Sequence, residues 1–232
     1  MSRDHLIELI KTSQRRSIDD IGEHHLVGDV NIFIKDNLPG NIQISNVIQH
    51  LRKYIPDQLL NLLDVVYIGH MPEFDERNIN AFTRDAALFV TNEQDNEIDM
   101  IDDVIHELAH VVENNYNQII YGDDEIEKEF LRKREVLRRV LKYENYPVGD
   151  FYFKKVEFDS EFDSFLTNAV GYTKLRVYSQ HIFASPYAAT SLREYFADGF
   201  EDYFLGKRAS LKKISPILYS KLEELHNEIQ NY

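Results

Sequence analysis

The distribution of apolar and polar positions separates a first half rich in short strands from a second half of helices. Alternation with a period of two residues predicts a strand at 30–34, and a short β-branched run predicts a buried strand at 63–68. Residues 80–91 are typical of a hairpin or of paired strands that end in the apolar run 87–91. From about residue 96 the spacing is mostly helical. Strands followed by helices favour an α+β fold.

Two helices are expected within the first half. One covers residues 4–16 and carries apolar side chains on one face (Leu6, Ile7 and Ile10). The other has Ser45 at its N-cap and ends before Pro56, because the residue before a proline disfavours helical backbone. The first helix contains acidic residues and lacks a small-residue cleavage site, unlike a signal peptide. We therefore expect a cytoplasmic protein by default, or a secreted one if the sequence is a processed form.

The composition limits the chemistry that the chain can perform. None of the 232 residues is a cysteine, which excludes disulfides, thiolate zinc sites and thiol nucleophiles. Any metal must therefore be held by His, Asp or Glu. No apolar run approaches the roughly 20 residues of a membrane span, so we expect no membrane partner.

The charge balance disfavours nucleic acid as a partner. Lys and Arg total 26 against 40 Asp and Glu, which gives a net charge of -14. One charge-rich segment, 123–142, predicts a helix with Ile126, Phe130, Val136, Leu137 and Val140 as its apolar members. Its basic residues are either a start for a nucleic-acid surface or, as we expect, a solvated helix face paired with nearby acids. These basic residues are Arg132, Lys133, Arg134, Arg138 and Arg139.

An HExxH motif at 106–110 carries the chemistry. On a helix, His106 and His110 lie one turn apart on the same side, so that both imidazoles can bind one ion. Glu107 lies near enough to polarise a metal-bound water as a general base. At 100° per residue an apolar stripe that includes Ile101 and Ile105 falls opposite the two histidines. The helix can therefore bury one face and offer both histidines to a cleft.

A catalytic zinc site needs a third protein ligand, for which the residues leave alternatives open. Glu129 follows His110 at roughly the distance at which thermolysin-like zinc sites have their third ligand, but it lies in the charge-rich helix. Glu194 shares a helix face with Asp198 and Glu201, opposite an aromatic face made of Phe196, Phe200, Tyr203 and Phe204. Ser191 and Glu194 also form a capping-box pattern, in which Glu194 would only close the start of its helix.

Together these pieces resemble the catalytic domain of anthrax toxin lethal factor and the secreted clostridial Pro-Pro endopeptidases. The matching segments are 106–110, then Tyr187 with Thr190, then the run from Glu194 to Phe200. Residues 87–91 occupy the place of that family's edge strand, which lines the substrate cleft. The helix expected at 216–230 matches the family's C-terminal helix.

The resemblance implies a zincin-like metallopeptidase formed by a single domain of residues 1–232. Its N-terminal lobe, 1–115, would hold a small mixed sheet and the active-site helix, and a helical lobe, 116–232, would carry the third ligand. The implied cofactor is Zn²⁺, and the substrate is a peptide or protein. Zinc would be bound by His106, His110 and Glu194. Glu107 would be the catalytic base, Tyr187 would donate to the oxyanion, and Asp198 would orient a ligand histidine.

The gap between His110 and Glu194 departs from the family, since residues 111–193 make it about twice as long as usual. The extra helical region at 123–160 suggests an alternative function, a catalytically weak, metal-stabilised binding or regulatory module that uses these helices as its partner surface. A further alternative is an intracellular protease that cleaves one regulatory protein, because no export signal is found.

Overall fold

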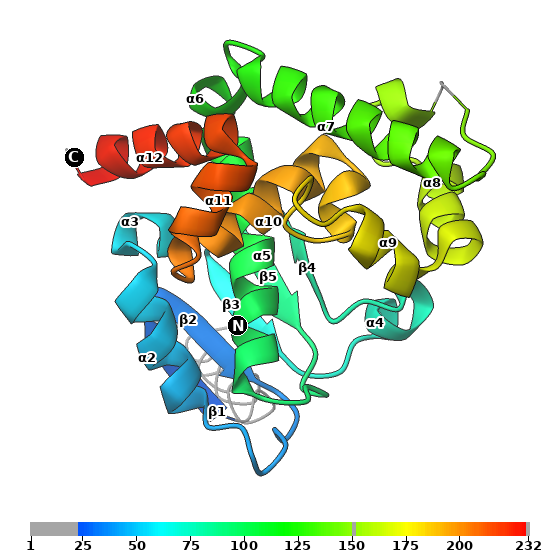
Figure 1. Ribbon diagram of the computed structural model, residues 1–232. Coiled ribbons are helices and arrows are strands. Elements are labelled where there is room, and N and C mark those ends of the chain that lie inside the picture. Colours follow the sequence, from blue (N-terminus) through cyan, green and yellow to red (C-terminus); the bar gives the residue numbers. More distant parts are fainter. Residues whose placement is uncertain (1–22, 150–151, 231–232) are drawn as a thin grey trace, which may run out of the picture. The chain divides into compact units, whose positions relative to one another are not determined.

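The computed structural model of the protein describes residues 23–149 and 152–230. The chain divides into two compact units, Met1–Val111 and Val112–Tyr232. The division lies within helix α5 (Glu97–Asn115), less than two turns before its end and close to the predicted lobe boundary. Among the described residues the sheet belongs to the first unit and helices α6 to α12 to the second (Figure 1), which confirms the α+β class. The helix expected at 4–16 lies outside the described residues.

The first unit contains a five-stranded mixed sheet in the order β1-β2-β3-β5-β4. The outer pairs β1–β2 and β4–β5 are antiparallel, and the inner pairs β2–β3 and β3–β5 are parallel. Parallel neighbours need crossover connections, which are supplied here by helices. The bounds are β1 (Glu23–Val27), β2 (Val30–Ile34), α2 (Ile44–Tyr54), α3 (Asp57–Leu60), β3 (Val65–Ile68), α4 (Pro72–Arg77), β4 (Ala81–Arg84) and β5 (Ala87–Val90).

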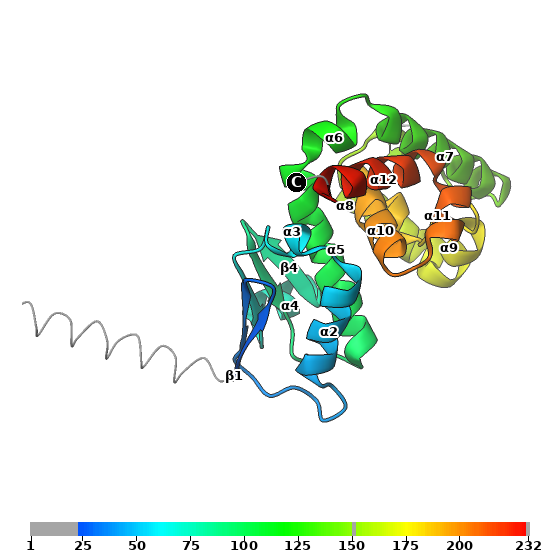
Figure 2. The same ribbon diagram turned by 90° about the vertical axis from the view of Figure 1, so that its left-hand side faces the viewer.

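The two faces of the sheet carry different side chains. Ile32, Val66 and Leu88 form a buried row on one face, where they are at most 3% exposed. Helices α2 and α5 cover one side of this sheet (Figure 2). On the other face the rings of Phe33, Tyr67 and Phe89 stack in a row, with centroids 5.7 and 5.4 Å apart. Stacked aromatic pairs contribute about 0.5–1.5 kcal/mol each beyond their burial, so this row ties the strands together.

The start of α2 differs from the sequence expectation. Ser45 lies inside the helix, and the N-cap is Gln43, whose side chain makes no capping bond. Instead the Glu97 carboxylate accepts hydrogen bonds from the backbone N–H of Gln43, at 2.8 Å, and from the side chain of Asn46, at 3.0 Å. A distant acid thus satisfies the helix terminus, which local sequence does not reveal.

Helix α5 is fixed by its buried stripe and by a cap. Ile101, Ile105 and Leu108 are at most 4% exposed, as the helical spacing predicts. Asn96 precedes the helix, and its side-chain oxygen accepts from the N–H groups of Ile98 and Asp99 at 2.8 and 3.1 Å. This Asn cap satisfies donors that the first turn would otherwise leave unpaired.

The second unit is helical around an aromatic core. Phe130, Phe162, Tyr195, Phe196 and Phe200 are all at most 1% exposed. The predicted helices at 123–142 and 216–230 are confirmed as α7 and α12. The bounds are α6 (Asn117–Tyr121), α7 (Glu125–Tyr143), η1 (Tyr152–Lys154), α8 (Ser160–Ser164), the π-helix η2 (Phe165–Gly171), α9 (Tyr172–Tyr178), η3 (Tyr187–Ala189), α10 (Leu192–Phe204), α11 (Arg208–Ile214) and α12 (Pro216–Gln230).

The basic residues of α7 are only partly the solvated face that the sequence predicts. Arg138 and Arg139 do pair with Glu135. Lys133 and Arg134, however, are buried. Lys133 donates to the carbonyls of Ile182 and Ile214 and to the Ser215 hydroxyl, and burial lowers its pKa to about 8.

Arg134 is likewise an internal residue. Its guanidinium lies 4.1 Å from the centroid of the Phe162 ring and donates to the carbonyl of Lys155. Val136, expected among the apolar members of the helix face, is instead 46% exposed. A nucleic-acid surface on α7 therefore loses two of its five cations to the core.

Glu129 connects α7 to two other helices of the second unit. Its carboxylate is 5% exposed and accepts from the backbone N–H groups of Ile217 and Leu218, both at 3.0 Å. It also accepts from the Tyr195 hydroxyl at 2.8 Å. The N-terminus of α12 is thus capped by an acid of α7, and a negative charge is favourable there.

We expect Glu129→Ala to lower the free energy of unfolding by about 3 kcal/mol, because three donors, two of them buried, lose a charged acceptor. Urea denaturation followed by circular dichroism measures this loss. Glu127→Ala on the same helix is the matched control and should change stability by less than about 0.5 kcal/mol. Equal stabilities of the two variants would contradict the capping role.

Candidate metal site on helix α5

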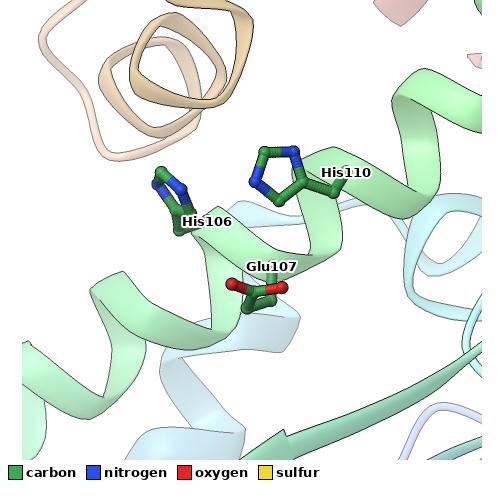
Figure 3. A group of neighbouring side chains, drawn as sticks. All are labelled: His106, Glu107 and His110. Atoms are coloured by element: carbon green, nitrogen blue, oxygen red, sulfur yellow. The ribbon is translucent and has the colours of Figure 1, made fainter. Parts of the chain in front are cut away.

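The three polar residues of the HExxH motif lie together on α5. Figure 3 shows the imidazoles of His106 and His110 on one side of the helix, and the Glu107 carboxylate lower in the view. One nitrogen of each histidine and one oxygen of Glu107 all lie within 4.8 Å of one another. The two rings are perpendicular, with centroids 5.0 Å apart and an interplanar angle of 88°. The predicted presentation of both histidines on one side of the helix is confirmed.

This donor set fits a divalent cation. Two zinc–nitrogen bonds of about 2.1 Å at a tetrahedral angle place the nitrogens about 3.4 Å apart. The candidate ligand atoms lie within 4.8 Å of one another. Rotation of the side chains has to move them by about 1.4 Å at most to reach that spacing. Imidazole nitrogens are ligands that zinc prefers. His110 is only 6% exposed, so its orientation is constrained by packing.

The surroundings of the motif are acidic. A cavity of about 370 Å³ lies near the start of α5 and is lined by acids and amides, which are Asn80, Glu93, Gln94, Asp95, Asp99, Asp102 and Asp103. Burial raises the pKa of the Asp103 carboxyl, which accepts from the Gln94 amide at 2.8 Å. A concave surface of one charge sign concentrates counter-ions, so this region attracts cations.

The strand next to the motif is not the one that the sequence indicated. Residues 80–91 do form a hairpin, but β5 (Ala87–Val90) is an inner strand paired with β3 and β4. The edge strand of this hairpin is β4, so the prediction of 87–91 as the edge strand is wrong. A signal was present, because β4 carries the polar residues Thr83 and Arg84 whereas β5 is entirely apolar.

Strand β4 contacts the motif directly. The Thr83 hydroxyl donates to Oε2 of Glu107 at 3.1 Å. Both side chains are partly buried, and both belong to the first unit. The carboxylate that the motif assigns as a base is therefore held on one oxygen by the edge strand.

Glu194, the ligand implied by the resemblance, lies in the second unit on α10. The predicted faces of this helix are confirmed, since Phe196, Phe200, Tyr203 and Phe204 are buried while Glu194, Asp198 and Glu201 are half-buried. Ser191 is the N-cap, and its hydroxyl accepts from the backbone N–H of Glu194 at 3.1 Å. This cap uses the backbone of Glu194, so it does not by itself decide the role of the carboxylate.

Two other predicted site residues also belong to the second unit. Tyr187 begins η3 and is 37% exposed, with its carbonyl accepting from the Thr190 hydroxyl at 2.8 Å. Glu129, the other candidate for the third ligand, is committed to the cap of α12 and to Tyr195. The contacts of Glu129 thus explain its burial without a metal. The roles of Tyr187, Glu194 and Asp198 stay predictions.

Comparison of the chain with protein-family models, curated proteins and solved structures gave no match. The resemblance to lethal factor-like enzymes therefore rests on the motif residues alone. Among the described residues, no helix has the length and apolar character needed to cross a bilayer.

We expect His106→Ala and His110→Ala each to weaken zinc binding at least about 100-fold, because two imidazoles are the core of the proposed site. Chelator competition on the purified protein measures the affinity. His70→Ala is the control, since His70 is exposed, its Nε2 lies 3.5 Å from Oδ2 of Asp75, and it belongs to no cluster of candidate ligands among the described residues. Retention of one tightly bound zinc in either variant would exclude the site.

Proposed function

We propose that the protein is a zinc-dependent metalloendopeptidase. The observation that carries this proposal is the grouping of His106, Glu107 and His110 on the side of α5 opposite its buried stripe. Two imidazoles with an adjacent carboxylate are the functional core of HExxH hydrolases. Asp102 and Asp103, about one turn before His106, line an acidic cavity whose charge favours cations near the motif.

In this proposal His106 and His110 bind zinc together with Glu194, which the family resemblance supplies. Bound zinc would acidify a water molecule and polarise the peptide carbonyl. Glu107 accepts the proton of the attacking water and delivers it to the leaving amine. The Tyr187 hydroxyl donates a hydrogen bond to the oxygen that becomes negative in the transition state.

An extended peptide is the substrate class that suits the sheet. Among the described residues β4 pairs only with β5, so its outer backbone groups are available to another strand. Peptides bind to such edges through main-chain hydrogen bonds. The substrate would therefore lie along β4, rather than along 87–91 as the sequence suggested.

The second proposed function is a binding or regulatory module. One feature of the extra helical region favours it. Within 123–160, Val136, Tyr143 and Phe158 are exposed by 46%, 84% and 55%. Exposed apolar side chains of this size mark partner surfaces where they are contiguous. This alternative predicts that the effects of the protein in cells survive loss of Glu107.

We expect Glu107→Gln to lower kcat by at least about 1,000-fold while zinc remains bound at one equivalent, because the amide cannot accept the proton. A digest of a peptide library, with zinc measured on the same samples, provides both values. Glu76→Gln on α4 is the control, because Glu76 is an exposed acid of the same unit. Full activity of the Glu107 variant would refute its role as base.

We expect Glu194→Ala to remove zinc at micromolar chelator with little loss of stability. Ser191→Ala should lower stability by about 1 kcal/mol and leave zinc bound, because it deletes only the cap. Zinc analysis and thermal denaturation of both variants separate ligation from capping. If Glu194→Ala retains zinc, another group must complete the site.

A further inference from the structure

Thr83 continues a row of the sheet that is apolar on its three inner strands. In the strand register Thr83 lies opposite Leu88, which continues through Val66 to Ile32. These three aliphatic side chains are almost fully buried on the helix-covered face. At the edge strand the same row carries a hydroxyl, and that hydroxyl is directed to Glu107.

The contact restricts a side chain that would otherwise be mobile. The terminal torsion of a glutamate is broad, so that a partly exposed carboxylate samples many orientations. Threonine is β-branched and has few χ1 rotamers, and here its backbone is fixed in a strand. The donor is therefore rigid, and it binds Oε2 while Oε1 stays available for another partner.

We propose that Thr83 is a positioning residue for the general base. It anchors Oε2 of Glu107 and thereby aims Oε1 at the attacking water, an assignment that rests on the proposed metallopeptidase function. The hydroxyl does not touch the substrate or the metal in this role. Its effect is on orientation, so its loss lowers kcat more than it raises KM.

Three variants separate the hydroxyl from the shape of the side chain. Thr83→Val keeps the volume and removes the donor, whereas Thr83→Ser keeps the donor. Arg52→Gln is the control, because Arg52 is an exposed residue of α2 in the same unit and lies on neither β4 nor α5. If Thr83→Val does not fold, Thr83→Ala is used in its place.

Each variant is measured for zinc content, thermal stability, and kcat and KM on a cleaved peptide. The carboxyl ¹³C resonance of Glu107 in the zinc-free protein, assigned by its absence in Glu107→Gln, adds a readout that is independent of activity. We expect Thr83→Val to lower kcat about 10–100-fold with KM and zinc content unchanged, and to shift that resonance. Thr83→Ser should stay within about threefold of the wild type.

A wild-type kcat in Thr83→Val overturns the inference and leaves the proposed function intact. Equal losses of kcat in the valine and serine variants, or a loss of zinc with kcat, also overturn it, because packing would then be the cause. If the wild type cleaves no peptide, the proposed function itself fails. In that case Thr83 is only a structural donor, and a shift of the Glu107 resonance in Thr83→Val still reports the contact.

Discussion

The rotation of α5 about its own axis is the constraint on which the candidate site depends. Ile101, Ile105 and Leu108 bury one side of the helix, and their burial fixes which side faces away from the core. Residues 106 and 110 then appear together on another side, because they differ by four positions. Moving the apolar stripe by one residue would turn the histidines by about 100° and bring them toward the core.

Most of the first unit follows from periodicity. The strands at 30–34 and 63–68, the hairpin at 80–91 and the stripe of α5 were predictable, because burial on one face imposes a spacing that the sequence shows directly. The edge strand was predicted wrongly because a hairpin leaves open which of its two strands joins the sheet. The N-cap of α2 was predicted wrongly because its hydrogen-bond acceptor comes from Glu97, which is distant in sequence.

The candidate site itself was only half predictable. Spacing identifies His106, Glu107 and His110, since all three lie on one helix. Thr83 escaped because a single threonine in a strand has no motif, and its significance arises only when the register places it beside Glu107. Ligation by Glu194 depends on residues that lie far apart along the chain, which neither periodicity nor the bond between Ser191 and Glu194 settles.

Burial separates structural charges from candidate functional charges within the second unit. Glu129, Lys133 and Arg134 are each at most 9% exposed, and backbone or side-chain partners fix them within that unit. A buried charge with such partners is costly to rearrange, so it is unsuited to binding a further ligand. The acids of α10 are half-buried instead. Because α10 buries its aromatic face, its acids are left on the surface of the helix, where a cation can reach them at a smaller desolvation cost.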